Sequence, residues 1–402
     1  MKVAIMGFGV VGSGVAEVIS KNAQTIEKKS GVSLSLSHIL DIRDFEENEF
    51  APYLTKNFDD ILNDDETKIV VETMGGTEPA FTFVSACLEK GKHVVTSNKE
   101  LVAKKGYELL SLAKKNNVNF MFEASVGGGI PIIRPISRCL AANNITKIAG
   151  ILNGTTNFIL TKMIVDGIDF WAALKLAQEK GYAEKDPTAD VEGIDACRKI
   201  CILASLAFGN HVYPDNVYTQ GITKITLEDV ENAEKFGCVI KLIAQAEKLE
   251  NGKINLMVSP ALVKKSSMLA GVSGVFNACL VKGDATGDVL MYGKGAGKLA
   301  TASAVVADVI DCATNDEKRK FFGWDDAKED YVEDHLNVNA SLYVRATGTK
   351  EVVLASFPNA AFADANDGEV VFITGEDKER TILEKLASMD AEIISIIRTT
   401  DF

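Results

Sequence analysis

The pattern of hydrophobic and polar residues predicts a series of β–turn–α units over the first 130 residues of the chain. Short apolar runs, such as KVAIM at 2–6 and IVV at 69–71, have the length of buried strands. Each run leads into a turn of glycine or polar residues, and apolar residues then recur at spacings typical of a helix. Four such units end near residue 130, which predicts an α/β fold class with a Rossmann-type domain over 1–130.

Beyond residue 145 the pattern favours a mixed architecture. Helices are expected over 170–180 and in the long apolar stretch that ends at Phe208, and strands dominate 221–293. We therefore expect a mixed α+β domain over 131–320 that binds the substrate and dimerises. A further helix at 298–312 is expected to pack back on the first domain.

The segment 338–402 has its own pattern. It alternates cleanly in NASLYVRA, and it contains further strands and one clear amphipathic helix at ERTILEKLASM. This pattern predicts a small C-terminal α/β module.

The sequence GFGVVGSG directly follows the first predicted strand and opens a helix. Gly7, Gly9 and Gly12 match the spacing GxGxxG, which in this context is a strong fingerprint of a dinucleotide-binding loop. Gly7 is expected to make the tight turn, Gly9 to let a pyrophosphate approach the main chain, and Gly12 to pack helix against strand. The N–H groups at the start of the helix would then meet the phosphates.

The end of the second predicted strand bears on the choice between NAD and NADP. An acid at this position would bind the ribose 2′-hydroxyl and favour NAD, whereas an arginine would bind a 2′-phosphate and favour NADP. The chain has both, in Asp41 and Arg43, so the choice stays open. Arg43 as a phosphate ligand and Arg43 as a solvated loop residue are equally consistent with the sequence.

The stretch GYAEKDPTADVEGIDACRK at 181–199 is the main candidate for catalytic chemistry. Asp195 and Lys199 are four residues apart on a predicted helix, so they share one face of it. Such a pair is often only a solvated surface ion pair. Because the helix is apolar nearly all round, we favour the interpretation that these side chains line a cleft.

Composition and charge narrow the class of protein. Of the 402 residues, 47% are hydrophobic and 25% are charged, which is typical of soluble globular domains. The net charge of −13 and the lack of a Lys/Arg block argue against nucleic-acid binding, and no apolar run has the length of a membrane span. The seven cysteines form no CxxC and the N-terminus leads straight into a strand, so we expect no signal peptide and a cytoplasmic location.

Four segments of the chain together resemble homoserine dehydrogenases. They are TSNKELVA (96–103), FEASVGGGIPII (122–133), GILNGTTNFIL (150–160) and GYAEKDPTADVEGIDACRK (181–199). The resemblance covers the chain to about residue 315. It implies reversible NAD- or NADP-dependent interconversion of L-homoserine and L-aspartate 4-semialdehyde, on the route to threonine and methionine. It also implies a homodimer or a homotetramer.

The resemblance also implies roles for individual residues. The catalytic residues would be Lys199, Lys99 and Asp195. The substrate would bind Glu184, Asp190, Asp195, Gly154, Thr155 and Tyr182. The cofactor would bind Gly7, Phe8, Gly9, Val10, Val11, Gly12, Arg43, Thr73, Gly75, Lys99, Gly181 and Gly297. A monovalent cation, Na⁺ or K⁺, would bind mainly main-chain oxygens around Glu123, Val126, Gly128 and Ile130.

The module over 338–402 resembles the ACT domain that many members of this family carry as a threonine sensor. The acidic-then-glycine turn expected after its first strand is replaced by TGTK at 347–350, and only one helix is visible where two are expected. An oligomerisation role for the module is therefore an equal alternative.

Three further alternatives remain open at this stage. The chain could be a different nicotinamide enzyme with another small amino-acid or semialdehyde substrate. It could also be a dinucleotide sensor without turnover, in which the acidic stretch is only an ion-paired helix start. Gly297 fits a plain helix-start turn as well as it fits a cofactor contact.

Overall fold

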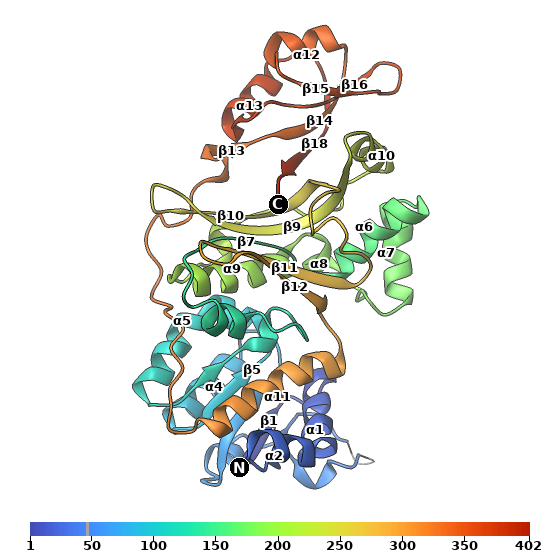
Figure 1. Ribbon diagram of the computed structural model, residues 1–402. Helices are drawn as coiled ribbons and strands as arrows, with labels where there is room; N and C mark the ends of the chain where they lie inside the picture. Colours follow the sequence, from blue (N-terminus) through green and yellow to red (C-terminus); the bar gives the residue numbers. More distant parts are fainter. Residues whose placement is uncertain (46–47) are drawn as a thin grey trace. The chain divides into compact units, whose positions relative to one another are not determined.

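The computed structural model describes residues 1–45 and 48–402, and these form two compact units (Figure 1). The first unit comprises Met1–Asn143, Cys201–Pro214 and Gly293–Lys328; the second comprises Asn144–Ile200, Asp215–Tyr292 and Glu329–Phe402. Each unit combines separate stretches of the chain, so the linear domain boundaries expected from the sequence stay predictions.

The first unit contains a six-stranded parallel sheet in the order β3-β2-β1-β4-β5-β6. This is the strand order of a doubly wound dinucleotide-binding fold, in which the order reverses next to β1. The strands are β1 (Lys2–Met6), β2 (Ser35–Leu40), β3 (Leu54–Thr55), β4 (Thr67–Glu72), β5 (His93–Thr96) and β6 (Phe120–Met121). The predicted Rossmann-type α/β architecture is confirmed.

Helices cover both faces of this sheet. They are α1 (Val10–Lys21), α2 (Ala23–Ser30), α3 (Asp59–Leu62), α4 (Ala80–Glu89), α5 (Lys99–Lys115) and α11 (Lys298–Thr314). Figure 1 shows α4 and α5 on one side of the sheet and α1, α2 and α11 on the other. Ala302, Val305 and Val309 of α11 belong to the same hydrophobic core as residues of α1, so a late segment of the chain completes the core of this unit.

The second unit contains a long mixed sheet in the order β12-β11-β7-β9-β10-β18-β14-β16-β15, with β8 paired to β10. Its strands are β7 (Ile145–Ile151), β8 (Tyr218–Thr219), β9 (Cys238–Lys248), β10 (Ile254–Lys264), β11 (Phe276–Gly283), β12 (Gly287–Lys294), β14 (Leu342–Thr347), β15 (Ala361–Ala363), β16 (Glu369–Ile373) and β18 (Ile393–Thr400). A separate pair is formed by β13 (Asn339–Ala340) and β17 (Asp377–Lys378).

Several helices begin in the second unit. They are α6 (Gly154–Asp166), α7 (Phe170–Glu179), α8 (Thr188–Val191), α9 (Ile194–Phe208), α10 (Leu227–Lys235), α12 (Lys350–Ser356) and α13 (Glu379–Ala387). Asn153 and Asp169 cap α6 and α7, because their side chains accept main-chain N–H groups of the first turn.

The C-terminal module has the element order β14-α12-β15-β16-α13-β18 and the strand order β18-β14-β16-β15, which is a ferredoxin-like arrangement. The expectation of a single helix is wrong. The missed helix, α12, contains two adjacent valines that favour a strand locally, but Val353 is fully buried in the module core. Because β18 pairs with β10 in parallel, the module continues the sheet of the second unit. Its likeness to an ACT domain stays a prediction.

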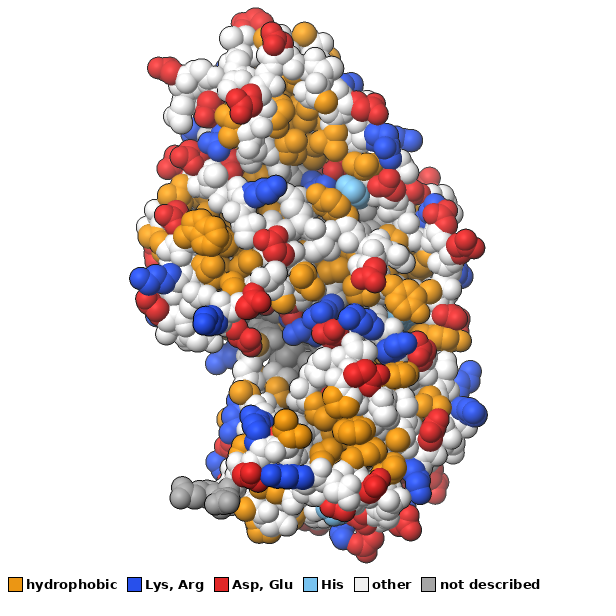
Figure 2. All heavy atoms as spheres, turned by 180° about the vertical axis from the view of Figure 1, so that it is seen from behind, with side chains coloured by type: hydrophobic (Ala, Val, Ile, Leu, Met, Phe, Trp, Pro, Cys, Tyr) orange, Lys and Arg blue, Asp and Glu red, His pale blue; other side chains and the backbone are white. Residues whose placement is uncertain are grey.

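The surface of the molecule carries both signs of charge. On the face shown in Figure 2, acidic and basic side chains are interspersed, and hydrophobic side chains gather over the C-terminal module at the top. In this module Leu354 and Ile394 are 43% and 41% exposed. None of the described helices is both long and apolar enough to cross a membrane.

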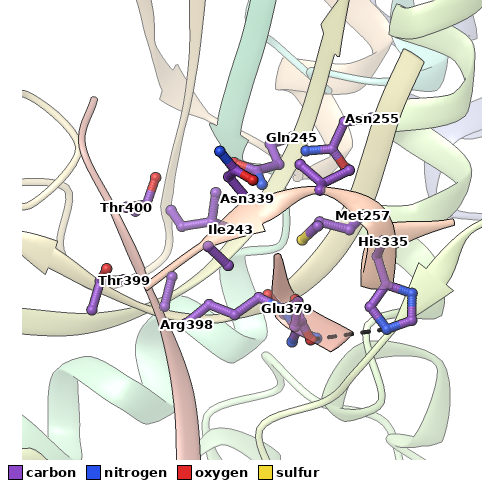
Figure 3. Close-up of a pocket in the computed structure, with 14 residues that line it drawn as sticks. Ile243, Gln245, Asn255, Met257, His335, Asn339, Glu379, Arg398, Thr399 and Thr400 are labelled. Atoms are coloured by element: carbon purple, nitrogen blue, oxygen red, sulfur yellow. Dashed lines mark hydrogen bonds and ion pairs between the residues drawn. The ribbon is translucent and has the colours of Figure 1, made fainter. Parts of the chain in front are cut away.

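A cavity of about 60 Å³ lies where β9, β10 and β18 meet the segment 335–340 (Figure 3). Beside it, Arg398 of β18 forms two hydrogen bonds with Glu379 of α13, and its guanidinium lies 4.6 Å from the centre of the Tyr218 ring. These contacts attach β18 to α13 and to β8. The cavity therefore belongs to the junction between the module and the rest of the second unit.

Candidate functional site

The predicted cofactor residues occupy the turns expected of a dinucleotide-binding domain, with one exception. Gly7, Phe8 and Gly9 form the loop after β1, and Val10, Val11 and Gly12 form the first turn of α1. Arg43 follows β2, Thr73 and Gly75 follow β4, Lys99 opens α5, and Gly297 caps α11. Gly181 is the exception, because it follows α7 in the second unit.

The glycine loop leaves no room for side chains at two positions. A Cβ atom on Gly12 would lie 1.9 Å from the carbonyl oxygen of Gly7, and one on Gly7 would lie 3.0 Å from the main chain of Thr73. Gly7 also has a φ of +95°, which favours glycine. Thr73 donates to the Gly7 carbonyl at 2.8 Å, which fixes the loop against the end of β4. No described side chain caps α1, so this cradle fits a pyrophosphate at the helix start.

Asp41, at the end of β2, binds the glycine loop and Arg43. Its Oδ2 accepts the N–H of Phe8 at 2.7 Å and the Nη2 of Arg43 at 2.9 Å, and its Oδ1 accepts the Nε of Arg43 at 2.9 Å. The Arg43 guanidinium and the main-chain donors hold the pKa of Asp41 well below its usual range. Arg43 and Lys56 line an open cavity of about 260 Å³ beside this strand end.

A buried polar cluster lies at the ends of β4 and β5, directly before Lys99 in the chain. Asn98 caps α5 by accepting the N–H of Leu101 at 3.0 Å, and it donates to the carbonyl of Gly76 at 2.6 Å. Glu72 accepts the Thr96 hydroxyl at 2.5 Å and the Met74 N–H at 2.7 Å, and burial raises its pKa. Sequence reasoning missed Glu72, although an acid that ends a buried strand is a usable signal.

Two of the predicted substrate residues, Asp190 and Asp195, meet at Asn153 in the second unit. The Asn153 Nδ2 atom donates to Asp190 Oδ1 at 2.7 Å and to Asp195 Oδ2 at 2.9 Å. Lys199 Nζ donates to the same Asp195 oxygen at 2.7 Å and to the carbonyl of Leu152 at 2.7 Å. Asp195 and Lys199 are only 4% and 8% exposed, so their pair is a buried one and not a surface ion pair.

Asp190 lies at the more open side of this cluster. Burial raises the pKa of its carboxyl and the charge of Asp195 adds to this, whereas the hydrogen bond from Asn153 and the charge of Lys199 oppose it. Sequence reasoning missed Asn153. The usable signal was an asparagine directly before a helix start in GILNGTTNFIL.

The remaining predicted substrate residues lie on the neighbouring turns. Thr155, in the first turn of α6, donates its hydroxyl to the carbonyl of Tyr182 at 2.8 Å. The Tyr182 ring packs edge-on against Phe158 of α6 with ring centres 5.1 Å apart. Gly154 begins α6 and has no room for a side chain, because a Cβ atom would lie 2.8 Å from the carbonyl of Val275. Glu184 is exposed on the loop after α7.

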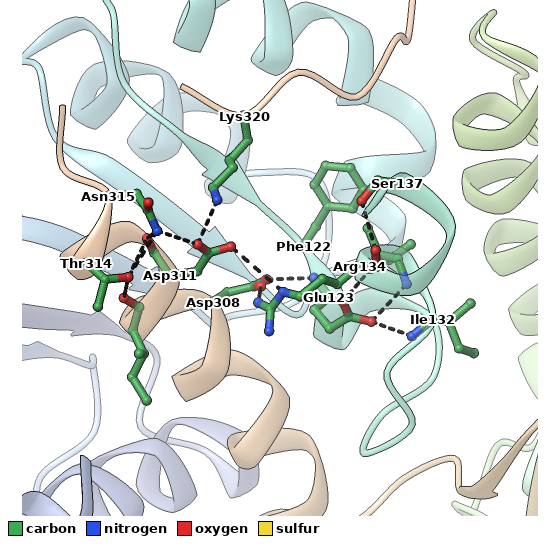
Figure 4. A network of polar contacts seen from close by, with 12 residues as sticks. Phe122, Glu123, Ile132, Arg134, Ser137, Asp308, Asp311, Thr314, Asn315 and Lys320 are labelled. Carbon is green, nitrogen blue, oxygen red and sulfur yellow. Dashed lines mark hydrogen bonds and ion pairs between the residues drawn. The ribbon is translucent and has the colours of Figure 1, made fainter. Parts of the chain in front are cut away.

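The predicted cation segment lies in the first unit. The Glu123 carboxylate accepts the main-chain N–H groups of Ile132, Ile133 and Arg134 at 2.6 to 2.9 Å (Figure 4). A cation here would therefore depend on main-chain oxygens, which suit Na⁺ or K⁺ as hard cations. Gly128 packs against the main chain of Gly295, where a Cβ atom would lie 2.3 Å from its carbonyl oxygen. The described residues contain no cluster of three or more His, Cys, Asp or Glu suited to a metal.

Family models of known proteins match most of the chain. Residues 7–123 match the model described as "Homoserine dehydrogenase, NAD binding domain", and residues 131–310 match the model described as "Homoserine dehydrogenase".

The chain belongs to the homoserine dehydrogenase family.

Individual relatives agree with this assignment. Homoserine dehydrogenase of Neisseria gonorrhoeae is 44% identical over 316 residues, which cover 78% of this chain and 72% of the relative. That of Bacillus subtilis is 41% identical over 314 residues, which cover 77% and 72%.

Solved homoserine dehydrogenases share the fold. The crystal structure of the enzyme from Thiobacillus denitrificans has a TM-score of 0.90 at 37% identity and covers 100% of this chain and 98% of that chain. A hyperthermophilic archaeal homoserine dehydrogenase in complex with NADPH has a TM-score of 0.66 at 29% identity and covers 80% and 99%.

Family membership confirms the resemblance stated from the four segments. As a homoserine dehydrogenase, the chain is an oxidoreductase that acts on a CH–OH group with NAD or NADP as cofactor. The sensor without turnover and the unrelated nicotinamide enzyme are thereby set aside. Family membership alone does not assign roles to individual residues, and the contacts around each residue bear on its role.

Proposed function

We propose that Lys199 is the general acid and base of the homoserine dehydrogenase reaction and that Asp195 orients its amine. The observation that carries this proposal is the position of Lys199 Nζ, which is buried and bonded to Asp195 Oδ2 and the Leu152 carbonyl, each at 2.7 Å. These two acceptors, one from the main chain and one from a carboxylate, fix the position of the amine. A group of this kind is suited to transfer a proton to one substrate atom.

The proposed chemistry follows from the charge that develops on the substrate. As the semialdehyde is reduced, negative charge grows on its carbonyl oxygen, and the Lys199 ammonium stabilises this charge and donates a proton. In the direction of homoserine oxidation, the neutral Lys199 amine accepts the hydroxyl proton. The bound nicotinamide supplies or accepts the hydride. We assign a second catalytic role to Lys99, which begins α5 at the carboxyl edge of the sheet and would also contact the cofactor.

The amino group of the substrate needs acceptors. We assign Glu184 and Asp190 to its ammonium, and Gly154, Thr155 and Tyr182 to the walls around it. Asp190 is bonded to Asn153 at 2.7 Å within the same cluster as Asp195, which supports a shared site for the ammonium and the reacting hydroxyl. Charge-assisted hydrogen bonds of this type contribute about 1.5–3 kcal/mol each.

Lys199→Ala tests the central role. We expect kcat to fall by roughly 10²–10⁴, the usual share of a general acid or base, while the KM for the cofactor stays unchanged. The assay follows NADPH absorbance with homoserine and with the semialdehyde. Turnover within a few-fold of the unsubstituted enzyme would remove Lys199 from this role.

We further propose that NADP is the preferred cofactor. The oxygens of Asp41 are engaged by Phe8 and Arg43, so this acid is poorly placed to accept ribose hydroxyls. Arg43 is 56% exposed and shares its cavity with Lys56, which supports a phosphate-binding role. Arg43→Gln should raise the KM for NADPH about 10-fold or more and leave that for NADH nearly constant. Equal effects on both cofactors would contradict a 2′-phosphate contact.

The remaining expectations are also proposals. We propose a Na⁺ or K⁺ ion at Glu123, Val126, Gly128 and Ile130, a cytoplasmic location, and a homodimer or homotetramer. The exposed Tyr292 of the edge strand β12 supports an association through the second unit. Light scattering after gel filtration tests the oligomeric state, and activity in Na⁺, K⁺ and tetramethylammonium salts tests the cation.

A further inference from the structure

Asn153 lies between β7 and α6, and the two ends of its amide bind different groups. Its Oδ1 accepts the N–H of Thr156 at 2.8 Å and so caps α6. Its Nδ2 donates to Asp190 and Asp195 at 2.7 and 2.9 Å. With 5% exposure, the amide has little freedom to turn, because the helix cap decides which end faces the carboxylates.

The two carboxylates share this one NH₂ group as a donor. Asp190 comes from α8 and Asp195 from α9, so Asn153 connects two elements that follow a loop. Asp195 Oδ2 accepts both Asn153 and Lys199, and this places the amide and the amine on either side of one oxygen. Two like charges in a half-buried region repel each other, and a donor shared between them offsets part of that repulsion.

We propose that Asn153 is a positioning residue for homoserine oxidation: its amide N–H groups hold Asp190 ready for the substrate and Asp195 ready for Lys199. This inference rests on the roles proposed above for Asp190, Asp195 and Lys199, because Asn153 acts through them. According to this inference, Asn153 affects both the affinity for the substrate and the transfer of the proton.

A helix cap alone is the competing explanation, and substitutions at this position separate the two. Serine and aspartate cap helices about as well as asparagine does. Asn153→Ser therefore keeps an acceptor for the Thr156 N–H and removes both donors. Asn153→Asp also keeps the acceptor and the shape, but it places a third carboxylate against the other two. A cap-only role predicts that both variants behave like the unsubstituted enzyme.

The experiment is steady-state kinetics of homoserine oxidation across pH at saturating NADP. We expect kcat/KM for homoserine to fall about 10- to 100-fold in Asn153→Ser and further in Asn153→Asp, with the KM for NADP constant within about twofold. The acid limb of the kcat/KM profile should move to higher pH by about one unit. This limb reports the loss of the Lys199 proton, and Asp195 holds that proton more tightly when the amide of Asn153 no longer offsets part of its charge.

Asp169 provides the matched control. It caps α7 in the same unit by accepting the N–H of Ala172 at 2.8 Å. Asp169→Ala should lower Tm by a few degrees and leave the kinetic constants and the pH profile unchanged. Circular dichroism and Tm of the Asn153 variants show whether each is folded. If Asn153→Asp does not fold, Asn153→Ser alone decides.

The outcomes separate this inference from the proposed function. Kinetic constants and a pH profile near those of the unsubstituted enzyme in Asn153→Ser or Asn153→Asp, together with an inactive Lys199→Ala, would overturn the positioning role and leave the role of Lys199 intact. An active Lys199→Ala would overturn the proposed function first. The positioning role is supported if Asn153→Asp is less active than Asn153→Ser and both are less active than the unsubstituted enzyme. The kinetic constants and the pH profile of the Asp169→Ala control must then be unchanged.

Discussion

The carboxylate of Asp195 in the second unit and that of Asp308 in the first are both almost fully buried, but they bind different kinds of partner. Asp308, on α11, accepts the main-chain N–H of Glu123 at 2.8 Å and the Arg134 guanidinium at 2.6 Å (Figure 4). Burial raises the pKa of Asp308 to about 7, and the charge of Glu123 adds to this. The network joins α11 to a segment 174 to 185 residues away in the sequence.

Asp195 binds an amide and an amine. Its Oδ2 accepts the amide of Asn153 and the amine of Lys199, and its neighbour Asp190 accepts the same amide. The main-chain N–H and the guanidinium that bind Asp308 keep their protons at neutral pH, so they stabilise the structure. An amine can exchange its proton with a substrate. The difference indicates that a buried carboxylate is a candidate for catalysis when it binds an amine that can transfer its proton. It is a candidate for a structural role when it binds the main chain and a guanidinium.

The largest expected effect on kcat comes from the replacement of Asp195 by asparagine, which is compared with the same replacement at Asp308. Asp195→Asn should lower kcat by about 10²-fold or more, because Lys199 loses the charge that orients its ammonium. Asp308→Asn should leave kcat within about threefold, because its partners serve the fold. Both kcat values are measured at saturating homoserine and NADP. A similar loss in both variants would remove the distinction between the clusters.

The Rossmann-type part of the fold was open to prediction because its signals are local. A buried run such as residues 2–6, followed at once by glycines and a helical pattern, specifies strand, turn and helix within a few positions. The position of Asp195 and Lys199 on one face of a helix was also predictable, because they are four residues apart. α12 was missed because its local preference opposes the helix, and only the burial of Val353 in the module core decides it.

The partners of these residues were not open to prediction in the same way. Asn153 meets Asp190 and Asp195 across 37 and 42 residues of sequence, and nothing in its own segment indicates those contacts. Asp308 appears in the sequence as one acid in an ordinary helix. Tertiary packing alone brings it to Glu123 and Arg134, so its buried network could not be foreseen from spacing.

The pH dependence of the free energy of unfolding should reveal the contribution of Asp308. Asp308 has a raised pKa in the folded state, so the folded protein holds a proton there that the unfolded chain releases from about pH 4. Its contribution to the free energy of unfolding is therefore complete below about pH 4 and is lost as pH rises to about 7, by up to a few kcal/mol. In Asp308→Asn, this contribution to the fall in the free energy of unfolding should be absent.

The measurement is urea unfolding of both proteins at intervals from pH 4 to pH 8. Subtracting the variant from the unsubstituted enzyme isolates Asp308 from other groups, including Asp41, whose lowered pKa acts in the opposite direction. A difference that does not depend on pH would show that Asp308 is ionised in the folded state throughout this range.

The smallest expected effect concerns Glu184, which extends the comparison to an exposed carboxylate. Solvent screens this acid, so its contact with the substrate ammonium should be weaker than one made by a buried group. Glu184→Gln keeps the shape and removes the charge, and we expect the KM for homoserine to rise by about 3- to 10-fold while kcat and the KM for NADP stay constant. Glu179→Gln, at the exposed end of α7, removes the same charge without a proposed contact and should change neither KM. Equal increases in both variants would mean that the overall field of the acidic loop attracts the substrate, and Glu184 would then lose its place as a direct ligand.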